Sequence, residues 1–158
     1  MPHQVTPTDV QLFGSVVAFT QQLTRRVDEH LAPFGLTSRQ WLLLAVLSKR
    51  FPGHAPTVSE ATDVFGTSRQ NVKQIALQLE RHGWLRLEPD ATDHRALRLV
   101  LTDRIGVFDE PGVRGEQAAF IRTVFGGLTL SERRNFLGLV TACIARLADH
   151  EPAERVSP

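Results

Sequence analysis

The stretch GTSRQNVKQIALQLERHGWL, residues 66–85, decides how this chain can fold. Its apolar residues recur at helical spacing and form one stripe, made of Val72, Ile75, Ala76 and Leu79. The first two turns carry hydroxyl, amide and cationic side chains, and no acid occurs before Glu80. Gly83 follows the last periodic residue, where a left-handed helix cap costs little. The stretch therefore predicts an amphipathic helix that ends at a glycine and exposes hydrogen-bonding groups at its start.

The polar side chains of these first turns are of the kinds that bind base edges and phosphates in a DNA major groove. They are Ser68, Arg69, Gln70, Asn71, Lys73 and Gln74. We expect the hydroxyl and the amides to face base edges, and the two cations to face phosphates or guanine. The alternative is an ordinary solvated helix face, although such a face more often carries paired Glu and Lys.

Two short segments with alternating apolar residues follow this helix and predict a β-hairpin with one buried face. Their apolar residues are Leu85 and Leu87 in the first segment, and Leu97, Leu99 and Leu101 in the second. The loop between them, PDATDHRA at residues 89–96, is too long for a tight turn. Because the loop region carries Arg95 and Arg98, we expect the hairpin tip to reach a partner.

Five segments fit the capping box, in which a threonine oxygen accepts from the third helical amide and a Gln or Glu reaches back. They are Thr8-x-x-Gln11, Thr37-x-x-Gln40, Thr57-x-x-Glu60, Thr67-x-x-Gln70 and Thr129-x-x-Glu132. Each box precedes an apolar periodic run, so the chain is predicted to be mainly α-helical with one small β-hairpin.

The expected helices outside the first stretch differ in how much of their surface is apolar. They cover about residues 9–32, 38–50, 58–65, 102–125 and 130–150, and Pro111 predicts a break near residues 110–115. The helix over 38–50 is apolar nearly all round, which indicates burial. The helix over 9–32 is longer than the average of about 11 residues, and its apolar stripe needs a partner.

The sequences LERHGWL (79–85), DATDHR (90–95) and LTDRIG (101–106), in this helical context, resemble the MarR family of bacterial winged-helix transcription regulators. The resemblance covers nearly the whole chain. In that family the hairpin tip, or wing, usually reads Asp-x-Arg-Asp-x-Arg. Asp90, Asp93 and Arg95 match this pattern, but Thr92 stands in place of the first arginine. The wing of this chain therefore carries one cation fewer than the family norm.

The resemblance implies a winged helix-turn-helix DNA-binding domain over residues 37–102. It also implies a helical dimerisation region at 1–36 and 103–150, followed by a flexible tail at 151–158. A homodimeric repressor would then place two reader helices on a pseudo-palindromic operator, with half-sites about 34–36 Å apart. The double-stranded DNA contacts expected from this comparison are Thr57, Ser68, Arg69, Gln70, Asn71, Lys73, Gln74, Asp93, His94 and Arg95.

Arg95 is the expected wing arginine, which would enter an adjacent minor groove where narrow AT-rich DNA concentrates negative potential. Asp93 would orient its side chain. The alternative is a surface ion pair between Asp93 and Arg95, which would contribute at most about 1 kcal/mol.

Family members often bind phenolic or other aromatic acids between the dimer helices and the reader domain. The residues that could line such a pocket here are Phe13, His30, Phe34, Arg39 and Trp41. The competing interpretation is plain core packing for the aromatic residues and solvation for Arg39, which would otherwise pair with the anion. A small aromatic or phenolic ligand is therefore an expected partner that no motif fixes.

Composition bounds the remaining function classes. The chain has 158 residues, 42% of them hydrophobic, and a net charge of +1. Between residues 37 and 104 there are ten Lys and Arg against seven Asp and Glu, so positive charge is mildly concentrated where DNA contact is expected. The longest apolar run is far too short to span a bilayer, and no signal pattern begins the chain, which predicts a cytoplasmic protein.

Several other sites are predicted to be absent or inert. The six histidines have no metal-site spacing, and the sequence holds no phosphate-binding glycine loop and no nucleophile motif, so neither a metal, a cofactor nor an enzyme is expected. Cys143 lies on an apolar stripe, where we expect it to be buried and unreactive. Asp9, Asp28 and Glu29 are interpreted as solvating charges. The rival functional hypothesis is a dimeric winged-helix protein-interaction module without sequence-specific DNA binding, which Thr92 and the weak basicity favour.

Overall fold

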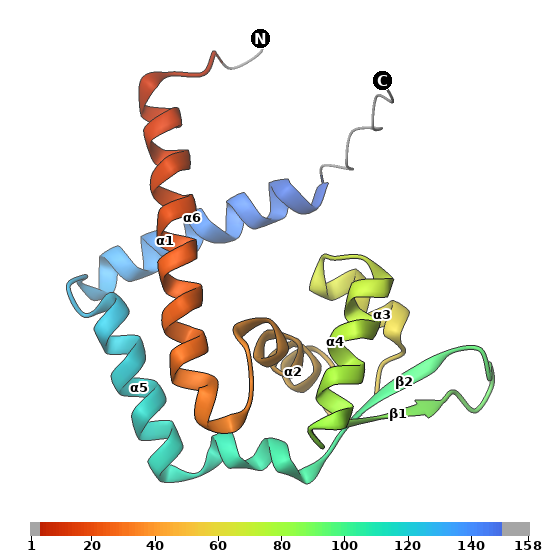
Figure 1. Cartoon of the computed structure of the whole chain (residues 1–158). Helices are drawn as coiled ribbons and strands as arrows, with labels where there is room; N and C mark the ends of the chain where they lie inside the picture. The colour runs from red at the N-terminus through yellow and green to blue at the C-terminus, as the bar shows by residue number, and fades with distance from the viewer. Residues whose placement is uncertain (1–3, 150–158) are drawn as a thin grey trace. The chain divides into compact units, whose positions relative to one another are not determined.

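A computed structural model describes residues 4–149, so the tail expected at 151–158 lies outside the described residues. The chain divides into two compact units, one through Arg104 and one from Ile105 onward. The elements of the first unit are α1 (Pro7–Leu31), a short 3-10 helix (Ala32–Phe34), α2 (Ser38–Arg50), α3 (Val58–Phe65), α4 (Arg69–Arg81), β1 (Leu85–Pro89) and β2 (Leu97–Leu101) (Figure 1). The fold is mainly α with one two-stranded antiparallel hairpin, as predicted.

The second unit contains α5 (Pro111–Phe125) and α6 (Leu130–Asp149), and a 3-10 helix at Asp103–Asp109 spans the boundary between the two units. The predicted break is confirmed at Glu110, because Pro111 occupies the first helical position, where its missing N–H costs nothing. The α-helix predicted from residue 102 was wrong for its first part, since residues 103–109 form a 3-10 helix. Gly112 and Gly115 are tolerated inside α5.

Three of the five predicted capping boxes are confirmed, at Thr37, Thr57 and Thr129. The box predicted at Thr8 was wrong, because Thr6 caps α1 and exchanges hydrogen bonds with Asp9. Asp9 is therefore a capping residue and not merely a solvating charge.

The box predicted at Thr67 was also wrong. The hydroxyl of Ser68 caps α4 by accepting from the Asn71 N–H at 3.2 Å. The Thr67 hydroxyl instead accepts from the Asn71 side-chain amide at 2.9 Å.

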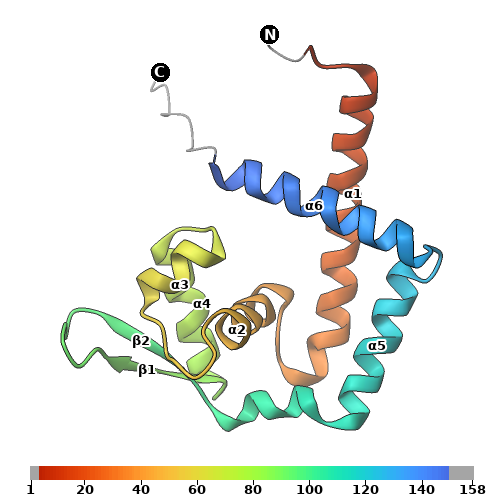
Figure 2. The same cartoon turned by 180° about the vertical axis from the view of Figure 1, so that it is seen from behind.

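The core of the first unit forms around the predicted stripe of α4, which packs on α2, α3 and the hairpin (Figures 1 and 2). The largest fully buried side chains include Trp84, Leu43, Leu44, Leu47, Leu79, Leu85 and Leu99. The prediction that α2 is buried all round was wrong, because Trp41 and Leu42 remain 36% and 47% exposed. Only one face of α2 meets α3, α4 and β2 in this unit.

The hairpin has the predicted alternation, with Leu85 opposite Leu101 and Leu87 opposite Leu99. Leu85 and Leu99 are fully buried, while the other three leucines are half-buried. The second edge of β2 binds the segment that leads into α3, since the Leu99 N–H donates to the Pro56 carbonyl at 2.8 Å. This bond ties the base of the hairpin to the start of α3.

The C-terminal end of α1 is joined to α2 by a carboxylate. Asp28 Oδ1 accepts from the Ser38 N–H at 2.5 Å, at the N-terminus of α2, where a negative charge also complements the helix dipole. The interpretation of Asp28 as a solvating charge was therefore wrong. Glu29, by contrast, forms only exposed ion pairs with Arg25 and Arg26. Within residues 4–149, none of the helices combines the length and apolar character that crossing a membrane requires.

Candidate nucleic-acid interface

The helix-turn-helix consists of α3, a three-residue turn and α4. Gly66 ends α3 in the left-handed conformation, with φ of 73°, and its N–H donates to the Thr62 carbonyl at 3.1 Å. A side chain at this position would be strained, so glycine permits the sharp turn that leads to Ser68. The two helices thereby pack closely while the start of α4 points out of the core.

The polar residues at the start of α4 are exposed, as the sequence pattern required. Exposed side chains are those of Ser68, Arg69, Gln70, Lys73 and Gln74, and Asn71 is half-buried. The Asn71 side chain already makes one hydrogen bond within the protein, because its amide group donates to the Thr67 hydroxyl. This bond fixes the orientation of one amide and leaves its carbonyl oxygen as an acceptor. The helix end therefore offers donors and acceptors on a rigid support, with no carboxylate in its first turn.

The reader helix α4 continues into the hairpin with almost no intervening loop. Gly83 has φ of 72°, its N–H donates to the Glu80 carbonyl, and the Trp84 N–H donates to the Leu79 carbonyl, both at 2.9 Å. These two bonds form a Schellman motif at the glycine predicted to end the helix. Glu80 Oε1 also accepts from the Leu87 N–H of β1 at 2.7 Å. The reader helix and β1 are therefore held as one body.

The wing is organised by Asp90, which is 4% exposed although it lies at the base of the long loop. Its Oδ1 accepts from the Thr92 hydroxyl at 2.6 Å and from the N–H groups of Thr92 and Asp93 at 2.9 Å each. The Thr92 hydroxyl, followed by the two N–H groups, holds the pKa of Asp90 well below its usual range. Thr92, the departure from the family pattern, is thus a structural part of the tip.

Arg98 is turned toward the protein rather than outward, so the prediction that it helps the tip to reach a partner was wrong. Its Nε donates to Asp90 Oδ2, and its Nη1 donates to the Ala55 carbonyl at 2.6 Å. A guanidinium can serve both acceptors because its N–H groups form a fork. The sequence did not lead us to predict that Arg98 and Asp90 anchor the base of the wing. The signal was the spacing Asp90-x-Thr92-Asp93, which is typical of an aspartate that accepts from amides two and three residues onward.

The remaining cations and polar groups of the tip point outward. Asp93, His94 and Arg95 are exposed, and Asp93 Oδ1 accepts from the backbone N–H of Arg95 at 3.0 Å. In the part of the chain that the structure describes, no side-chain ion pair joins Asp93 to Arg95. Asp93 therefore shapes the backbone at Arg95 and leaves the guanidinium exposed.

Thr57, the first of the predicted contacts, caps α3 and is half-buried. Its N–H donates to Glu60 at 2.7 Å, and this bond is the main reason why the pKa of Glu60 is lowered. Thr57 also pairs with Arg98 as an isolated bridge beside β2. Thr57 thus lies where α3 and the base of the wing meet.

The five residues predicted to line a ligand pocket are not brought together within one copy of the chain. Phe13 is 73% exposed on the N-terminal half of α1. It lies seventeen residues before His30, about 25 Å along the helix. His30 and Phe34 are half-buried, and Arg39 is exposed at the start of α2, two residues before Trp41 and so about half a turn away from it. A pocket that used all five would require a second molecule.

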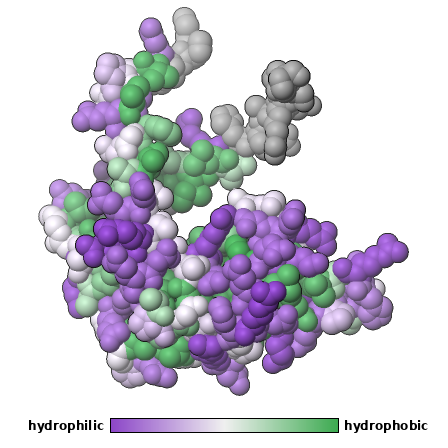
Figure 3. All heavy atoms as spheres, in the orientation of Figure 1, coloured by the Kyte–Doolittle hydropathy of each residue, from purple (hydrophilic) through white to green (hydrophobic). Residues whose placement is uncertain are grey.

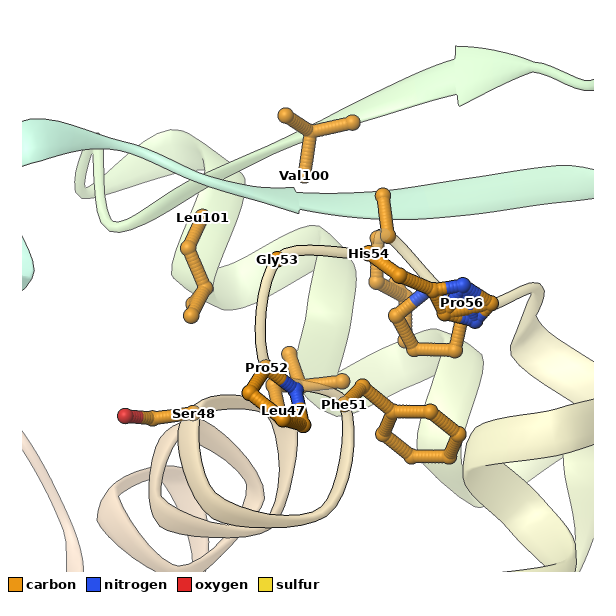
Figure 4. Close-up of a pocket in the computed structure, with 11 residues that line it drawn as sticks. Leu47, Ser48, Phe51, Pro52, Gly53, His54, Pro56, Val100 and Leu101 are labelled. Atoms are coloured by element: carbon orange, nitrogen blue, oxygen red, sulfur yellow. The ribbon is translucent and has the colours of Figure 1, made fainter.

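A cavity of about 450 Å³ lies elsewhere in the first unit (Figure 4). It is a partly open hollow between the last turn of α2, the loop from Phe51 to Pro56, and β2. None of the five predicted ligand residues lines it. The cavity was not predicted from the sequence, because its lining residues come from segments about fifty positions apart.

Two further predictions concern reactive and metal-binding groups. The prediction that Cys143 is buried was wrong, because in this single chain its side chain is exposed on α6. Among the described residues, no three His, Cys, Asp or Glu side chains gather as metal ligands would. His3 and His150 lie outside the described residues.

Comparisons with known proteins identify the winged-helix segment. A family model described as the MarR family matches residues 34–96. The transcriptional activatory protein BadR of Rhodopseudomonas palustris is 29% identical over 103 residues, which are 62% of this chain and 56% of BadR. The chain thus spans about half the length of this curated relative.

Solved structures share the fold over most of the chain. AbsC, a MarR family transcriptional regulator from Streptomyces coelicolor, has a TM-score of 0.72 and 24% identity, and the match covers 91% of this chain and 96% of AbsC. Sco3205, a MarR family regulator from the same organism solved in complex with DNA, has a TM-score of 0.77 and 20% identity, with 99% and 97% covered. All three relatives are named for transcription, in agreement with the expectation that the chain is not an enzyme. The matched segment and the similarity to BadR show that the winged-helix segment, residues 34–96, resembles the MarR family, and the solved structures share its fold.

Proposed function

We propose that this protein regulates transcription by binding double-stranded DNA in a sequence-specific manner. The observation that carries the proposal is the exposed, acid-free start of α4, held rigidly beside a wing that exposes Arg95. In this proposal α4 enters the major groove and Arg95 enters the adjacent minor groove. The DNA complex of the structural neighbour Sco3205 supports this use of the fold.

The proposed active form is a homodimer. Large apolar side chains are exposed on α1 and α6, where Figure 3 draws green surface, although such faces are costly to leave in water. On α1 they include Val10, Phe13, Val16 and Val17, and on α6 they include Leu137, Leu139, Ile144 and Leu147. We assign residues 1–36 and 103–150 to the dimerisation region because a second copy would cover these faces. Two reader helices would then meet half-sites about 34–36 Å apart.

The proposed action is repression from the cytoplasm by occupation of an operator that overlaps a promoter. A small aromatic or phenolic ligand, bound by residues such as His30, Phe34 and Trp41, would release the DNA by changing the spacing of the two reader helices. Since both helices must fit one duplex at once, a ligand that prefers another spacing weakens DNA binding, and DNA weakens ligand binding equally.

The test begins with selection of genomic DNA fragments by the purified chain and sizing of the complex. Affinity for one selected operator is then measured at moderate salt for the wild type and for Gln70→Ala combined with Asn71→Ala. We expect at least about a tenfold loss, because each good base contact contributes about 1–3 kcal/mol of discrimination. Arg81→Ala, in the last turn of the same helix, is the matched control. Unchanged affinity in the double variant would refute sequence reading by α4.

The second candidate is a dimeric winged-helix interaction module without sequence-specific DNA binding. It is favoured by Thr92 in place of a wing arginine and by the net charge of only +1. Comparing the affinity for a random duplex with the affinity for the selected fragment distinguishes the sequence-specific regulator from the interaction module. Equal, weak binding to both duplexes at low salt supports the interaction module.

A further inference from the structure

The cavity beside β2 has walls from three segments of the first unit. The last turn of α2 contributes Leu47 and Ser48, and β2 contributes Leu99 and Leu101. Figure 4 shows the Leu101 side chain directed from β2 toward the loop that borders the cavity. The volume of about 450 Å³ falls within the range of about 300–1,000 Å³ that is typical of small-molecule sites.

The lining of this cavity favours flat, apolar molecules. The rings of Phe51 and His54 are stacked on one wall, with centroids 5.6 Å apart and an interplanar angle of 27°. Proline rings and leucine side chains form much of the remaining surface. An aromatic ligand could extend the Phe51–His54 stack, and such ring pairs contribute about 0.5–1.5 kcal/mol beyond their burial.

The same lining disfavours charged molecules. No Asp, Glu, Lys or Arg lines the cavity, and His54 is its one titratable side chain. An ionised ligand would lose hydration without gaining a partner of opposite charge. Ser48 lies at the rim, and Figure 4 shows its hydroxyl directed away from β2 and the loop. The lining therefore favours an uncharged aromatic molecule.

The loop that borders the cavity, residues 51–56, also holds the base of the wing. The Ala55 carbonyl accepts from Arg98 Nη1, and the other side of the same guanidinium binds Asp90. Asp90 in turn holds the backbone N–H groups of Thr92 and Asp93 at the tip. A continuous chain of hydrogen bonds thus runs from a cavity-lining residue to the exposed end of the wing.

We propose that this cavity binds an uncharged, planar aromatic molecule, and that occupancy alters the hold of Ala55 on Arg98 and thereby positions the wing tip. The site lies at the end of α2 opposite to Trp41, and it uses none of the residues assigned to the dimer-side ligand. Binding in the cavity does not depend on the function proposed above. The consequence for DNA rests on that proposed function.

The binding half is tested with indole and 2-naphthol as probes of the full chain, by calorimetry and by nitrogen-labelled amide NMR. Saturable binding to the wild type is expected, with the largest shifts in residues 51–56 and 99–101. Ser48→Trp fills the rim from an exposed position and should weaken binding by about tenfold or more. Arg81→Ala, an exposed position in the last turn of α4, is the control and should bind normally, while 2-naphthoate should bind about tenfold more weakly than 2-naphthol.

Three results would overturn the binding half. They are the absence of saturable binding by either probe, unchanged binding in a folded Ser48→Trp variant, and equal binding of 2-naphthoate. A folded Ser48→Trp variant is verified by its amide spectrum. If that variant does not fold, Leu101→Phe replaces it, since Leu101 is half-buried and faces the loop.

The coupling half is read first without DNA, from the amide signals of Thr92 and Asp93 on saturation with 2-naphthol. These signals should shift in the wild type and shift much less in Arg98→Lys, because an ammonium cannot reproduce the two-sided fork. With the selected operator, 2-naphthol should change wild-type affinity by about fivefold or more and leave Arg98→Lys nearly unchanged. Probe binding with unmoved tip signals overturns the coupling. A chain that binds probe and moves its tip but never binds DNA refutes the proposed function alone.

Discussion

Arg98 Nε donates to Asp90 Oδ2 across the base of the hairpin loop, and this pair anchors a tip that is otherwise exposed. Asp90 is nearly inaccessible to solvent, whereas the Arg98 side chain is 36% exposed. Around this pair, Thr92 and Asp93 fold back onto the same carboxylate. The order of the wing therefore depends on one ionised aspartate.

The first prediction concerns acid sensitivity of the wing. Hydrogen bonds from Thr92, Asp93 and Arg98 lower the pKa of Asp90 in the folded chain below its unfolded value of about 4. The stability that this carboxylate contributes is thus present above about pH 4 and is lost as the pH falls further. Between pH 6 and pH 3, the tip amides of the wild type should lose hydrogen-exchange protection. Asp90→Asn should show low protection throughout, and a wild-type tip that stays equally protected at pH 3 would contradict this prediction.

The second prediction restores the arginine that the family pattern places at position 92. Thr92→Arg adds a cation to the tip, so the slope of log K against log salt for operator binding should steepen by up to about 0.9. It also removes the hydroxyl bond to Asp90, so Thr92→Gln serves as an uncharged control of similar length. Equal slopes for Thr92→Arg and Thr92→Gln would mean that position 92 does not approach phosphates.

The third prediction compares two adjacent carboxylates of α1. Asp28→Ala removes the acceptor of the Ser38 N–H, and a hydrogen bond to a charged group contributes about 1.5–3 kcal/mol. Glu29→Ala removes only exposed ion pairs, which contribute about 0.2–1 kcal/mol. Urea unfolding should therefore give a clearly larger loss in free energy of unfolding for Asp28→Ala. Similar losses in the two variants would show that Asp28 does not cap α2.

The fourth prediction addresses the exposed apolar faces. If a second copy covers α1 and α6, Phe13→Glu combined with Leu137→Glu should convert the dimer to a monomer in sedimentation experiments, because buried unpaired charges are costly. Arg25→Glu, at an exposed position of α1, is the control. The monomer should also lose operator affinity strongly, since one reader helix would engage only one half-site. A dimer that persists in the double variant would place the interface elsewhere.

Where the signals were local, sequence reasoning located the elements closely. The bounds of α2 and α3 coincide with the predicted ones, because each helix begins at a capping box that uses residues three positions apart. The buried stripe of α4, and the end of this helix at Gly83, could likewise be predicted from the spacing of residues alone. The start of α1 was missed because Thr6 and Thr8 both offer a plausible cap, and only Thr6 precedes a proline at the first helical position.

The burial and orientation of side chains that depend on tertiary contacts could not be predicted from the sequence. Trp41 and Leu42 belong to an apolar run, but only one side of α2 has partners in its unit. The inward turn of Arg98 required knowing that Ala55, forty-three positions earlier, lies beside β2. The exposure of the polar residues on α4 could be predicted from the sequence, because polar groups on the face opposite a buried stripe meet solvent.

The Schellman motif at Gly83 has a practical consequence for chimeric proteins. Because two backbone hydrogen bonds fix the turn at Gly83 and Trp84 between α4 and β1, we expect an exchange of residues 69–81 alone to disturb how the helix is held. A segment transferred to a related scaffold should extend through Leu87. It then includes both partners of the hydrogen bond in which the Leu87 N–H donates to Glu80 Oε1. A shorter exchange would transfer the side chains of α4 without the contacts that set the orientation of the helix.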